Sequence, residues 1–212
     1  MFIRGTSSCK RMSILAVSLV LVLIIGMFSG CAKESGENKK VSAETAQVVI
    51  PVDSEFMQGN IWSTGGGPSS SIMYEGLITK NRKGSYDGWL AESWKASEDA
   101  KVWTFKLVKD AEWHDGEAFT SEDVKFTHDF LKTRKVFLSS VLAGVDRVEC
   151  PDKNTAVFYL KASNPSFLDD LSHCPGIPIV PKHIWQDVGD PGKFEDNQFI
   201  GTGPFKFADR IS

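Results

Sequence analysis

The stretch that decides the fold is residues 90–131, LAESWKASEDAKVWTFKLVKDAEWHDGEAFTSEDVKFTHDFL. Large apolar side chains alternate with other residues over 102–107, which is the period-two pattern of a strand with one buried face. A turn-rich segment follows at 113–117, and Thr120 then stands three positions before an acid, a pair that can cap the free N–H groups of a helix. The stretch therefore predicts a strand, a tight turn and a capped helix whose inward residues are Val124, Phe126, Thr127, Phe130 and Leu131.

Short motifs inside and outside this stretch follow one another in a recognisable order. They are LAESW at 90–94, WTFKL at 103–107, WHDG at 113–116, EDV at 122–124, YEGL at 74–77, PKHIW at 181–185 and GTGPF at 201–205. Together they resemble the signature of the family 5 extracellular solute-binding proteins, the dipeptide, oligopeptide and nickel receptors of ABC importers. The resemblance covers about residues 48–207. It implies structural signature positions at Trp94, Trp113, His114, Asp115, Gly116, Asp123, Gly201 and Gly203.

The resemblance implies an α/β fold of the periplasmic-binding-protein type, class II, as in the peptide receptors. Those receptors have two lobes, and residues 47–212 correspond to most of the first lobe only, with a mixed sheet, flanking helices and a β-hairpin subdomain. In the family the solute is enclosed between the lobes, so that closure depends on contacts with both. We therefore expect this chain to be part of a longer receptor and to bind the natural solute weakly or not at all by itself.

The resemblance also implies a function that needs no enzymatic step: capture of a solute outside the membrane and delivery to an ABC permease with its ATPase subunits. We expect a monomer that binds oligopeptides or dipeptides in an extended conformation. A receptor of the same fold for nickel, haem or a sugar is the alternative, and an extracytoplasmic hydrolase is a distant one. In the peptide receptors the acid that binds the amino terminus of the ligand lies in the second lobe, so these residues do not identify the solute.

A candidate ligand contact lies in the Gly/Ser-rich segment of residues 58–71. In the resembling receptors the loop after the first strand faces the cleft between the lobes, which suggests Asn60, Ile61, Trp62 and Ser63. The alternative is a surface loop whose Trp62 packs against the core. The three consecutive glycines are compatible with a ligand-contacting loop and with a surface loop, because glycine permits close backbone approach as well as sharp turns.

The first 30 residues predict a secretion signal, in which three basic residues precede a long apolar run. The segment ends in FSG before Cys31, which resembles a bacterial lipobox whose cysteine receives acyl chains such as palmitate and becomes the mature N-terminus. Residues 31–46 have almost no large apolar side chain, which is typical of a disordered tether. We expect an extracytoplasmic protein anchored by lipid to the bacterial cell membrane; an uncleaved anchor and plain secretion are the alternatives.

The charge of the chain argues against a nucleic-acid partner. Residues 31–212 carry 21 of the 24 basic residues and all 27 acidic residues, a formal net charge of −6. A nucleic-acid binder needs a basic face that displaces counterions from phosphates. About 180 residues are also enough to bury a hydrophobic core, which favours a globular part beyond the tether.

Cysteine usage leaves one pair in the folded part, because Cys9 lies in the signal and Cys31 is the expected lipidation site. Cys150 and Cys174 can form a disulfide in an oxidising exterior or remain two buried thiols, and sequence does not decide between the two. No spacing of cysteines and histidines matches a zinc pattern. We therefore expect no metal site and no cofactor.

His114 and Asp115, with Glu117 nearby, raise an enzymatic alternative, because a histidine beside a carboxylate can act as a general base. However, neighbouring residues of a turn point apart, and no Ser or Cys nucleophile is specified close by. We expect a structural turn whose side chains tie the strand to the following helix, and no enzymatic activity.

The remaining sequence predicts several shorter elements. Apolar runs at 145–149 and 156–160 flank the turn cluster PDKN and predict an antiparallel hairpin. Short helices are expected at 164–171 and at 181–185, where proline is well tolerated in the first turn. Residues 205–207 are expected to form a strand.

Overall fold

The computed structural model describes residues 61–62, 72–134, 136, 138–172, 176–196 and 198–208, all within the compact unit Pro51–Ser212. The predicted signal peptide, Cys31 and the tether lie outside the described residues, as do Asn60, Ser63 and Cys174. Among the helices of the described ranges, none has both the length and the apolar character needed to cross a bilayer.

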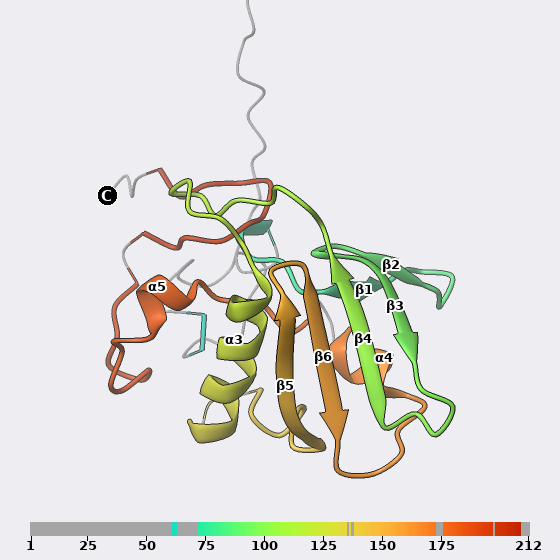
Figure 1. Ribbon diagram of the computed structural model, residues 1–212. Helices are drawn as coiled ribbons and strands as arrows, with labels where there is room; N and C mark the ends of the chain where they lie inside the picture. The colour runs from blue at the N-terminus through green and yellow to red at the C-terminus, as the bar shows by residue number, and fades with distance from the viewer. Residues whose placement is uncertain are drawn as a thin grey trace, which may run out of the picture. The chain divides into compact units, whose positions relative to one another are not determined.

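The described elements are short strands with helices between and after them (Figure 1). In chain order they are β1 (Ile78–Lys80), β2 (Tyr86–Gly88), β3 (Ala91–Ala96), β4 (Val102–Leu107), α3 (Ser121–Thr133), β5 (Val145–Asp152), β6 (Thr155–Leu160), α4 (Phe167–Leu171) and α5 (Lys182–Trp185). The strand expected at 102–107 is confirmed as β4, and the expected hairpin is confirmed as β5 and β6. The helices expected at 164–171 and 181–185 are confirmed as the shorter α4 and α5.

Four strands form a sheet in the order β3-β4-β6-β5, and β1 pairs with β2 in a separate small sheet. The α/β fold class is confirmed, but the described strands do not form the mixed sheet that we expected, because all their pairings are antiparallel. The reason is that β3–β4 and β5–β6 are two hairpins. They join through β4 and β6, which also run antiparallel.

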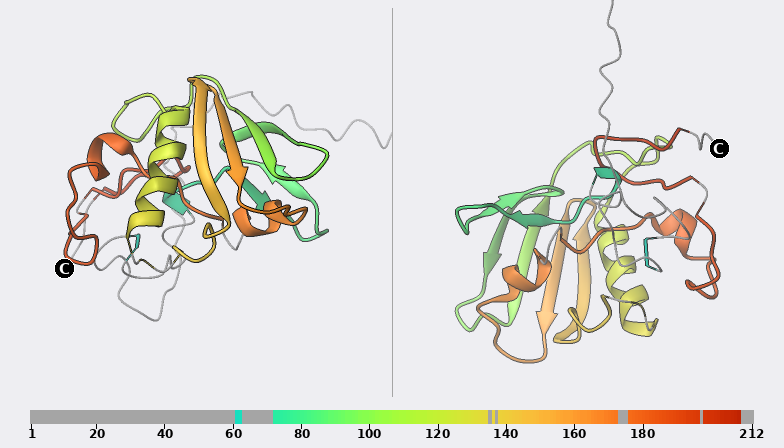
Figure 2. Two further views of the ribbon diagram at one scale, coloured as in Figure 1. Left: turned by 60° about the horizontal axis from the view of Figure 1, so that its bottom comes forward. Right: turned by 180° about the vertical axis from the view of Figure 1, so that it is seen from behind.

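The core lies on one face of the four-stranded sheet. The alternation in β4 buries Trp103, Phe105 and Leu107, and Phe158 of β6 meets Phe105 edge-on with ring centroids 5.4 Å apart. Phe167 of α4 packs on Phe158 at 5.5 Å. Each such fully buried side chain stabilises the fold by about 1.5–3 kcal/mol. In Figures 1 and 2, α3 lies alongside β5, and α4 lies against the sheet near β4 and β6.

Helix α3 begins with the predicted cap. The Thr120 hydroxyl accepts a hydrogen bond from Glu122 N–H at 3.3 Å, and Asp123 Oδ2 accepts one from Thr120 N–H at 2.9 Å. The expected inward residues Val124, Thr127, Phe130 and Leu131 are buried, whereas Phe126 is half-buried. The helix also buries His128, which the apolar pattern did not predict.

The strand expected at 205–207 is wrong. Gly203 N–H donates to Met73 O at 2.8 Å and Phe205 N–H donates to Ile72 O at 3.2 Å, but no ladder develops from these two bonds. The physical reason is the partner: Ile72 and Met73 lie in a helical turn, which cannot offer an extended edge to a strand.

Candidate functional site

Four segments that are far apart in the sequence meet around the turn at residues 113–116. We call them the signature cluster: residues 72–76, 113–116, 181–183 and 201–205. Figures 1 and 2 show the β4–α3 connection running beside the segment near the C-terminal end of the described chain. The hydrogen bonds below define how these segments are joined.

The turn itself is built by local hydrogen bonds. Trp113 N–H donates to Glu117 O at 2.8 Å, and Gly116 N–H donates to Trp113 O at 2.9 Å. Gly116 has a φ of 91°, a left-handed conformation that favours glycine. The Trp113 ring is buried and packs edge-on against Phe119, with ring centroids 5.9 Å apart. The turn is therefore fixed to the core through Trp113, and the next two side chains reach other segments.

His114 binds the segment that contains Gly201 and Gly203. Its backbone N–H donates to Gly201 O at 2.9 Å, and Gly201 N–H donates to its Nδ1 at 3.2 Å. Because Nδ1 accepts, the neutral ring carries its hydrogen on Nε2, which lies 2.8 Å from Gly203 O and donates to it. Lys206 Nζ also donates to His114 O at 2.7 Å. Both ring nitrogens are thus occupied by backbone groups, which makes this histidine a clamp and leaves no nitrogen to act as a base.

Asp115 contacts a different segment. Its Oδ2 lies 2.8 Å from His183 Nε2 in α5, and its Oδ1 accepts a hydrogen bond from Glu117 N–H at 3.2 Å. Burial alone would raise the pKa of Asp115, but the hydrogen bonds from His183 and Glu117 outweigh it and hold that pKa below its usual range. We expected the turn to be tied to the following helix α3. These two side chains instead reach residues 201–203 and α5.

The glycines at 201 and 203 permit a very close approach to residues 72–73. A Cβ at Gly201 would lie 1.8 Å from Met73 O, and one at Gly203 would lie 2.6 Å from Ile72 O. Any side chain would collide with this backbone. Gly76 is similarly close to Ile177, with 2.9 Å from a built Cβ to Ile177 O. Two signature segments, 72–76 and 201–205, therefore touch through bare backbone, and the first also touches the backbone of Ile177.

A buried tyrosine and aspartate fasten the loop before Gly201 to the same cluster. Tyr74 Oη donates to Asp196 Oδ2 at 2.8 Å, and Asp196 Oδ1 accepts from the N–H groups of Gln198 and Phe199 at 3.2 and 2.8 Å. Burial first, and the Asp196 charge second, raise the pKa of Tyr74 well above its usual value. Burial also raises the pKa of the half-buried neighbour Glu75.

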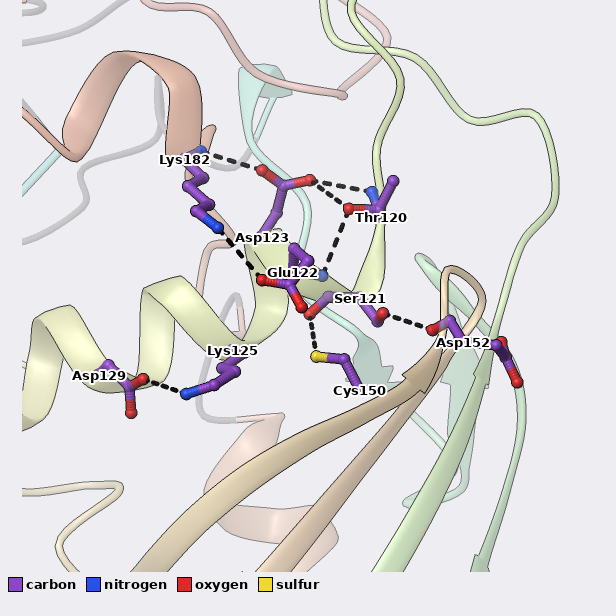
Figure 3. Close-up of polar contacts among 9 residues, drawn as sticks. All are labelled: Thr120, Ser121, Glu122, Asp123, Lys125, Asp129, Cys150, Asp152 and Lys182. Carbon is purple, nitrogen blue, oxygen red and sulfur yellow. Dashed lines mark hydrogen bonds and ion pairs between the residues drawn. The ribbon is translucent and has the colours of Figure 1, made fainter.

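Asp123 connects the start of α3 to α5, as Figure 3 shows. Its Oδ2 accepts from Thr120 N–H, and its Oδ1 accepts from the backbone N–H of Lys182 at 2.9 Å. The Lys182 ammonium pairs with Glu122 at 3.1 Å, where both side chains are about half exposed. One buried carboxylate therefore satisfies two backbone donors, one of them 59 positions away from Asp123 in the sequence.

The predicted ligand contacts are partly described. Ile61 and Trp62 are 6% and 4% exposed, and the Trp62 ring lies 6.1 Å from Phe130 of α3 and 6.2 Å from Trp185 of α5. Phe130 and Trp185 also meet edge-on at 5.7 Å. This burial favours the alternative in which Trp62 packs against the core. A ligand role for Asn60, Ile61, Trp62 and Ser63 stays a prediction.

Cys150 carries a free thiol, and Figure 3 shows it near the start of α3. Its Sγ donates to Ser121 O at 3.1 Å, and burial raises the pKa of this thiol, which makes it less reactive. A disulfide with Cys174 stays a prediction, since Cys174 lies outside the described residues. Within the described ranges, no group of three or more His, Cys, Asp or Glu side chains could hold a metal ion.

The cluster is a structural framework, because the side chains of His114 and Asp115 and the close glycine contacts fix its backbone segments in place. Trp94, the remaining signature position, lies half-buried on β3 with its ring 6.5 Å from Phe105. Sequence reasoning missed two members, Tyr74 and His183, and also missed Asp196, which binds Tyr74 from the loop before Gly201. Tyr74 and His183 stood inside quoted motifs, but nothing in the sequence specified their partners, which lie 122 and 68 positions away, respectively.

Comparison with protein-family models finds a match to a family of bacterial solute-binding proteins. The family model for bacterial extracellular solute-binding proteins, family 5, matches residues 85–211. A predicted ABC transporter peptide-binding protein of Brucella ovis is 40% identical over 162 residues, which cover 71% of this chain and 30% of the relative. The periplasmic oligopeptide-binding protein OppA of Haemophilus influenzae is 28% identical over 190 residues, covering 79% and 35%.

Solved structures show the same likeness. NikZ of Campylobacter jejuni in complex with Ni(L-His) superposes with a TM-score of 0.62 at 28% identity, over 71% of this chain and 30% of that one. The oligopeptide-binding protein AppA of Bacillus subtilis in complex with a nonapeptide gives 0.60 at 26% identity, over 68% and 29%. The chain therefore spans about a third of the length of these relatives.

Proposed function

Because the chain belongs to the family 5 bacterial extracellular solute-binding proteins, we propose that the protein is the solute receptor of an ABC importer and that its solute is a peptide. The observation that carries this proposal is the 40% identity to a predicted ABC transporter peptide-binding protein. The receptor captures the peptide outside the membrane, delivers it to the permease and its ATPase subunits, and leaves it chemically unchanged. It acts as a monomer.

The signature cluster supports this role because its contacts hold several backbone segments in a fixed arrangement. A receptor that closes on its ligand needs segments that keep their geometry while other parts move. His114, Asp123 and Asp196 each bind two backbone groups with their side-chain atoms, and Gly201 packs directly on the backbone of Met73. The described residues therefore supply a fixed framework, and the ligand is held by the whole receptor.

A receptor for nickel is the second candidate. It is favoured by the similarity to NikZ, whose structure contains Ni(L-His), at a TM-score as high as that for the peptide-bound AppA. Haem and sugar receptors of the same fold complete the alternatives. A hydrolase has no support from His114, because both nitrogens of its ring bind backbone groups.

Ligand binding to the receptor that contains these residues tests the proposal. Thermal-shift and calorimetric titrations would use a mixture of peptides of two to nine residues, Ni(L-His), haem and an oligosaccharide. We expect peptides to stabilise the protein by about 2.7 kcal/mol at a concentration a hundredfold above their Kd. Stabilisation by Ni(L-His) alone would replace the peptide proposal with the nickel one. Turnover of the added peptide would contradict both.

We further propose that Cys31 is lipidated after removal of residues 1–30 and that residues 31–46 tether the folded part to the membrane. The sequence before Cys31 supports this, and two or more acyl chains on one residue give stable anchoring, whereas one chain binds only marginally. The test is labelling of cells with a palmitate analogue. Label is expected in the wild type and in Cys9→Ser, but not in Cys31→Ser. Equal labelling of all three would refute lipidation at Cys31.

A further inference from the structure

A small internal cavity lies between α3, β6, the end of α4 and the segment before α5. Its walls include Val124 of α3, Phe158 of β6, Leu171 of α4 and Ile177. These four residues are between 1% and 4% exposed, so buried side chains form this part of the cavity wall. Its volume of about 10 Å³ is close to that needed for a single water molecule.

His128 brings an unpartnered polar atom to this apolar region. It lines the cavity, it is 1% exposed, and its Nε2 has no hydrogen-bond partner among the described residues. Its Nδ1 lies 3.0 Å from Asp129 Oδ1, and the other oxygen of that carboxylate accepts from Lys125 Nζ at 2.6 Å. Because the carboxylate accepts, Nδ1 carries the hydrogen of the neutral ring, and Nε2 presents a buried lone pair. A buried acceptor without a donor is costly.

Thr127 provides a second polar group on the same wall. Its side chain lines the cavity and is 1% exposed, and its Oγ1 accepts a hydrogen bond from Val180 N–H at 3.1 Å. A hydroxyl that accepts in this way still has its own hydrogen to donate. The residues of the cavity wall thus include one with an unpartnered acceptor, His128 Nε2, and one with a hydroxyl hydrogen to donate, Thr127. One water molecule can donate a hydrogen bond to the acceptor and accept one from the donor.

We propose that this cavity is a binding site for a single structural water, which donates a hydrogen bond to His128 Nε2 and accepts one from Thr127 Oγ1. Two partners are the minimum that a buried water requires. The water completes the hydrogen bonding of His128, and its other partner, Thr127, already joins α3 to Val180 by a direct hydrogen bond. Neither the sequence pattern nor the proposed receptor function includes this site.

The whole 212-residue chain serves for the test, by crystallography at a resolution that orders internal waters and by NMR. We expect one ordered water within hydrogen-bond distance of both His128 Nε2 and Thr127 Oγ1. We also expect water–protein cross-peaks at the Thr127 methyl group and the His128 ring that indicate a residence time longer than a nanosecond, together with an unprotonated Nε2 in the ring ¹⁵N spectrum. An empty cavity in a structure whose wall residues are ordered, or a hydrogen on Nε2, overturns the proposal.

Variants make the assignment specific. His128→Leu and Thr127→Val should abolish the cross-peaks, whereas Thr127→Ser, which keeps the hydroxyl, should retain them. Thr133→Val is a matched control, because Thr133 lies on the same helix but outside the cavity, and this variant should keep the water. Cross-peaks that persist in His128→Leu would show that the water lies elsewhere and would overturn the site. If a variant does not fold, the wild-type measurement still decides.

Discussion

His114 and Gly201 hydrogen bond to each other in both directions across 87 positions of the chain. The histidine backbone donates to the glycine carbonyl, and the glycine backbone donates to the histidine ring. The remaining ring nitrogen reaches Gly203 O, so one side chain holds two backbone groups of the opposite segment. This pairing joins the β4–α3 turn to the end of the described chain.

Replacing His114 tests how much this pairing stabilises the fold. His114→Phe removes both side-chain hydrogen bonds and leaves Gly201 N–H and Gly203 O without them, which should lower the free energy of unfolding by about 2–3 kcal/mol. Urea denaturation followed by tryptophan fluorescence measures this. His183→Phe is the control: it removes one half-exposed pair with Asp115 and should cost less than about 1 kcal/mol. Equal losses in the two variants would show that the clamp adds nothing beyond a surface pair.

Replacing Gly201 tests the close contact between its backbone and the backbone of Met73. Gly201→Ala places a Cβ 1.8 Å from Met73 O, and because neither backbone can move freely, we expect a loss of about 3 kcal/mol or no folded protein. Gly189→Ala is the matched control, because nothing lies within 4 Å of its built Cβ, and its effect should be about 1 kcal/mol or less. Circular dichroism and urea midpoints report both. A stable Gly201→Ala variant would mean that the contact at residues 72–73 is looser than described.

Substitutions at the adjacent residues Asp123 and Glu122 compare a buried helix cap with a surface ion pair. Asp123→Ala leaves the N–H groups of Thr120 and Lys182 without their acceptor, so the free energy of unfolding should fall by about 2–3 kcal/mol. Glu122→Ala removes only the exposed pair with the Lys182 ammonium and should cost about 0.5 kcal/mol or less. Added salt should weaken the second effect and hardly change the first. The reverse ranking would contradict the role assigned to Asp123.

Because of His128, we expect the folded protein to lose stability in mild acid. Burial, the largest cause, lowers the pKa of His128 below 6.5, and the charges of Lys132 and Lys125 act in the same direction while Asp129 opposes them. The unfolded chain therefore takes up the proton at a higher pH than the folded chain does. The stability contributed by the neutral ring is fully present above pH 6.5, the ordinary histidine value, and is lost as pH falls toward the folded-state value.

The measurement is the free energy of unfolding at about pH 7.5 and about pH 5.5, a range in which histidine titrates. We expect the wild type to lose stability between these values and His128→Leu to lose less. Glu75 acts in the opposite sense, because burial raises its pKa and its protonation in acid favours the folded state. Glu75→Gln should therefore make the acid loss larger. Identical pH profiles for wild type and His128→Leu would contradict the assignment to His128.

Local patterns were sufficient to predict several of the described elements, although the strand predicted at 205–207 was wrong. The alternation at 102–107 gave β4, and the pair Thr120 and Asp123 gave the start of α3, because these signals depend on residues within a few positions of one another. The β5–β6 hairpin followed from the turn residues between two apolar runs, whereas the β3–β4 hairpin was not predicted. The short motifs predicted the protein family, and the family-model match over residues 85–211 then confirmed it.

Long-range partners could not be predicted in the same way. Nothing near His114 indicates that its ring binds Gly201 and Gly203, and the expected contact with the following helix was replaced by these bonds and by the Asp115–His183 pair. The joining of the two hairpins through β4 and β6 is likewise set by how their apolar faces pack. His128 was missed because a buried histidine at this position looks polar in any hydropathy pattern.

The reciprocal pairing of His114 with Gly201 also sets an order of events during synthesis. When the turn at 113–116 leaves the ribosome, its partners at 201–203 have not yet been made, so the ring of His114 and the backbone beside it remain open to water. Contacts of such high sequence separation form late and slow the completion of folding. Until residue 203 has emerged, the nascent chain has an unfinished region that chaperones and proteases can reach.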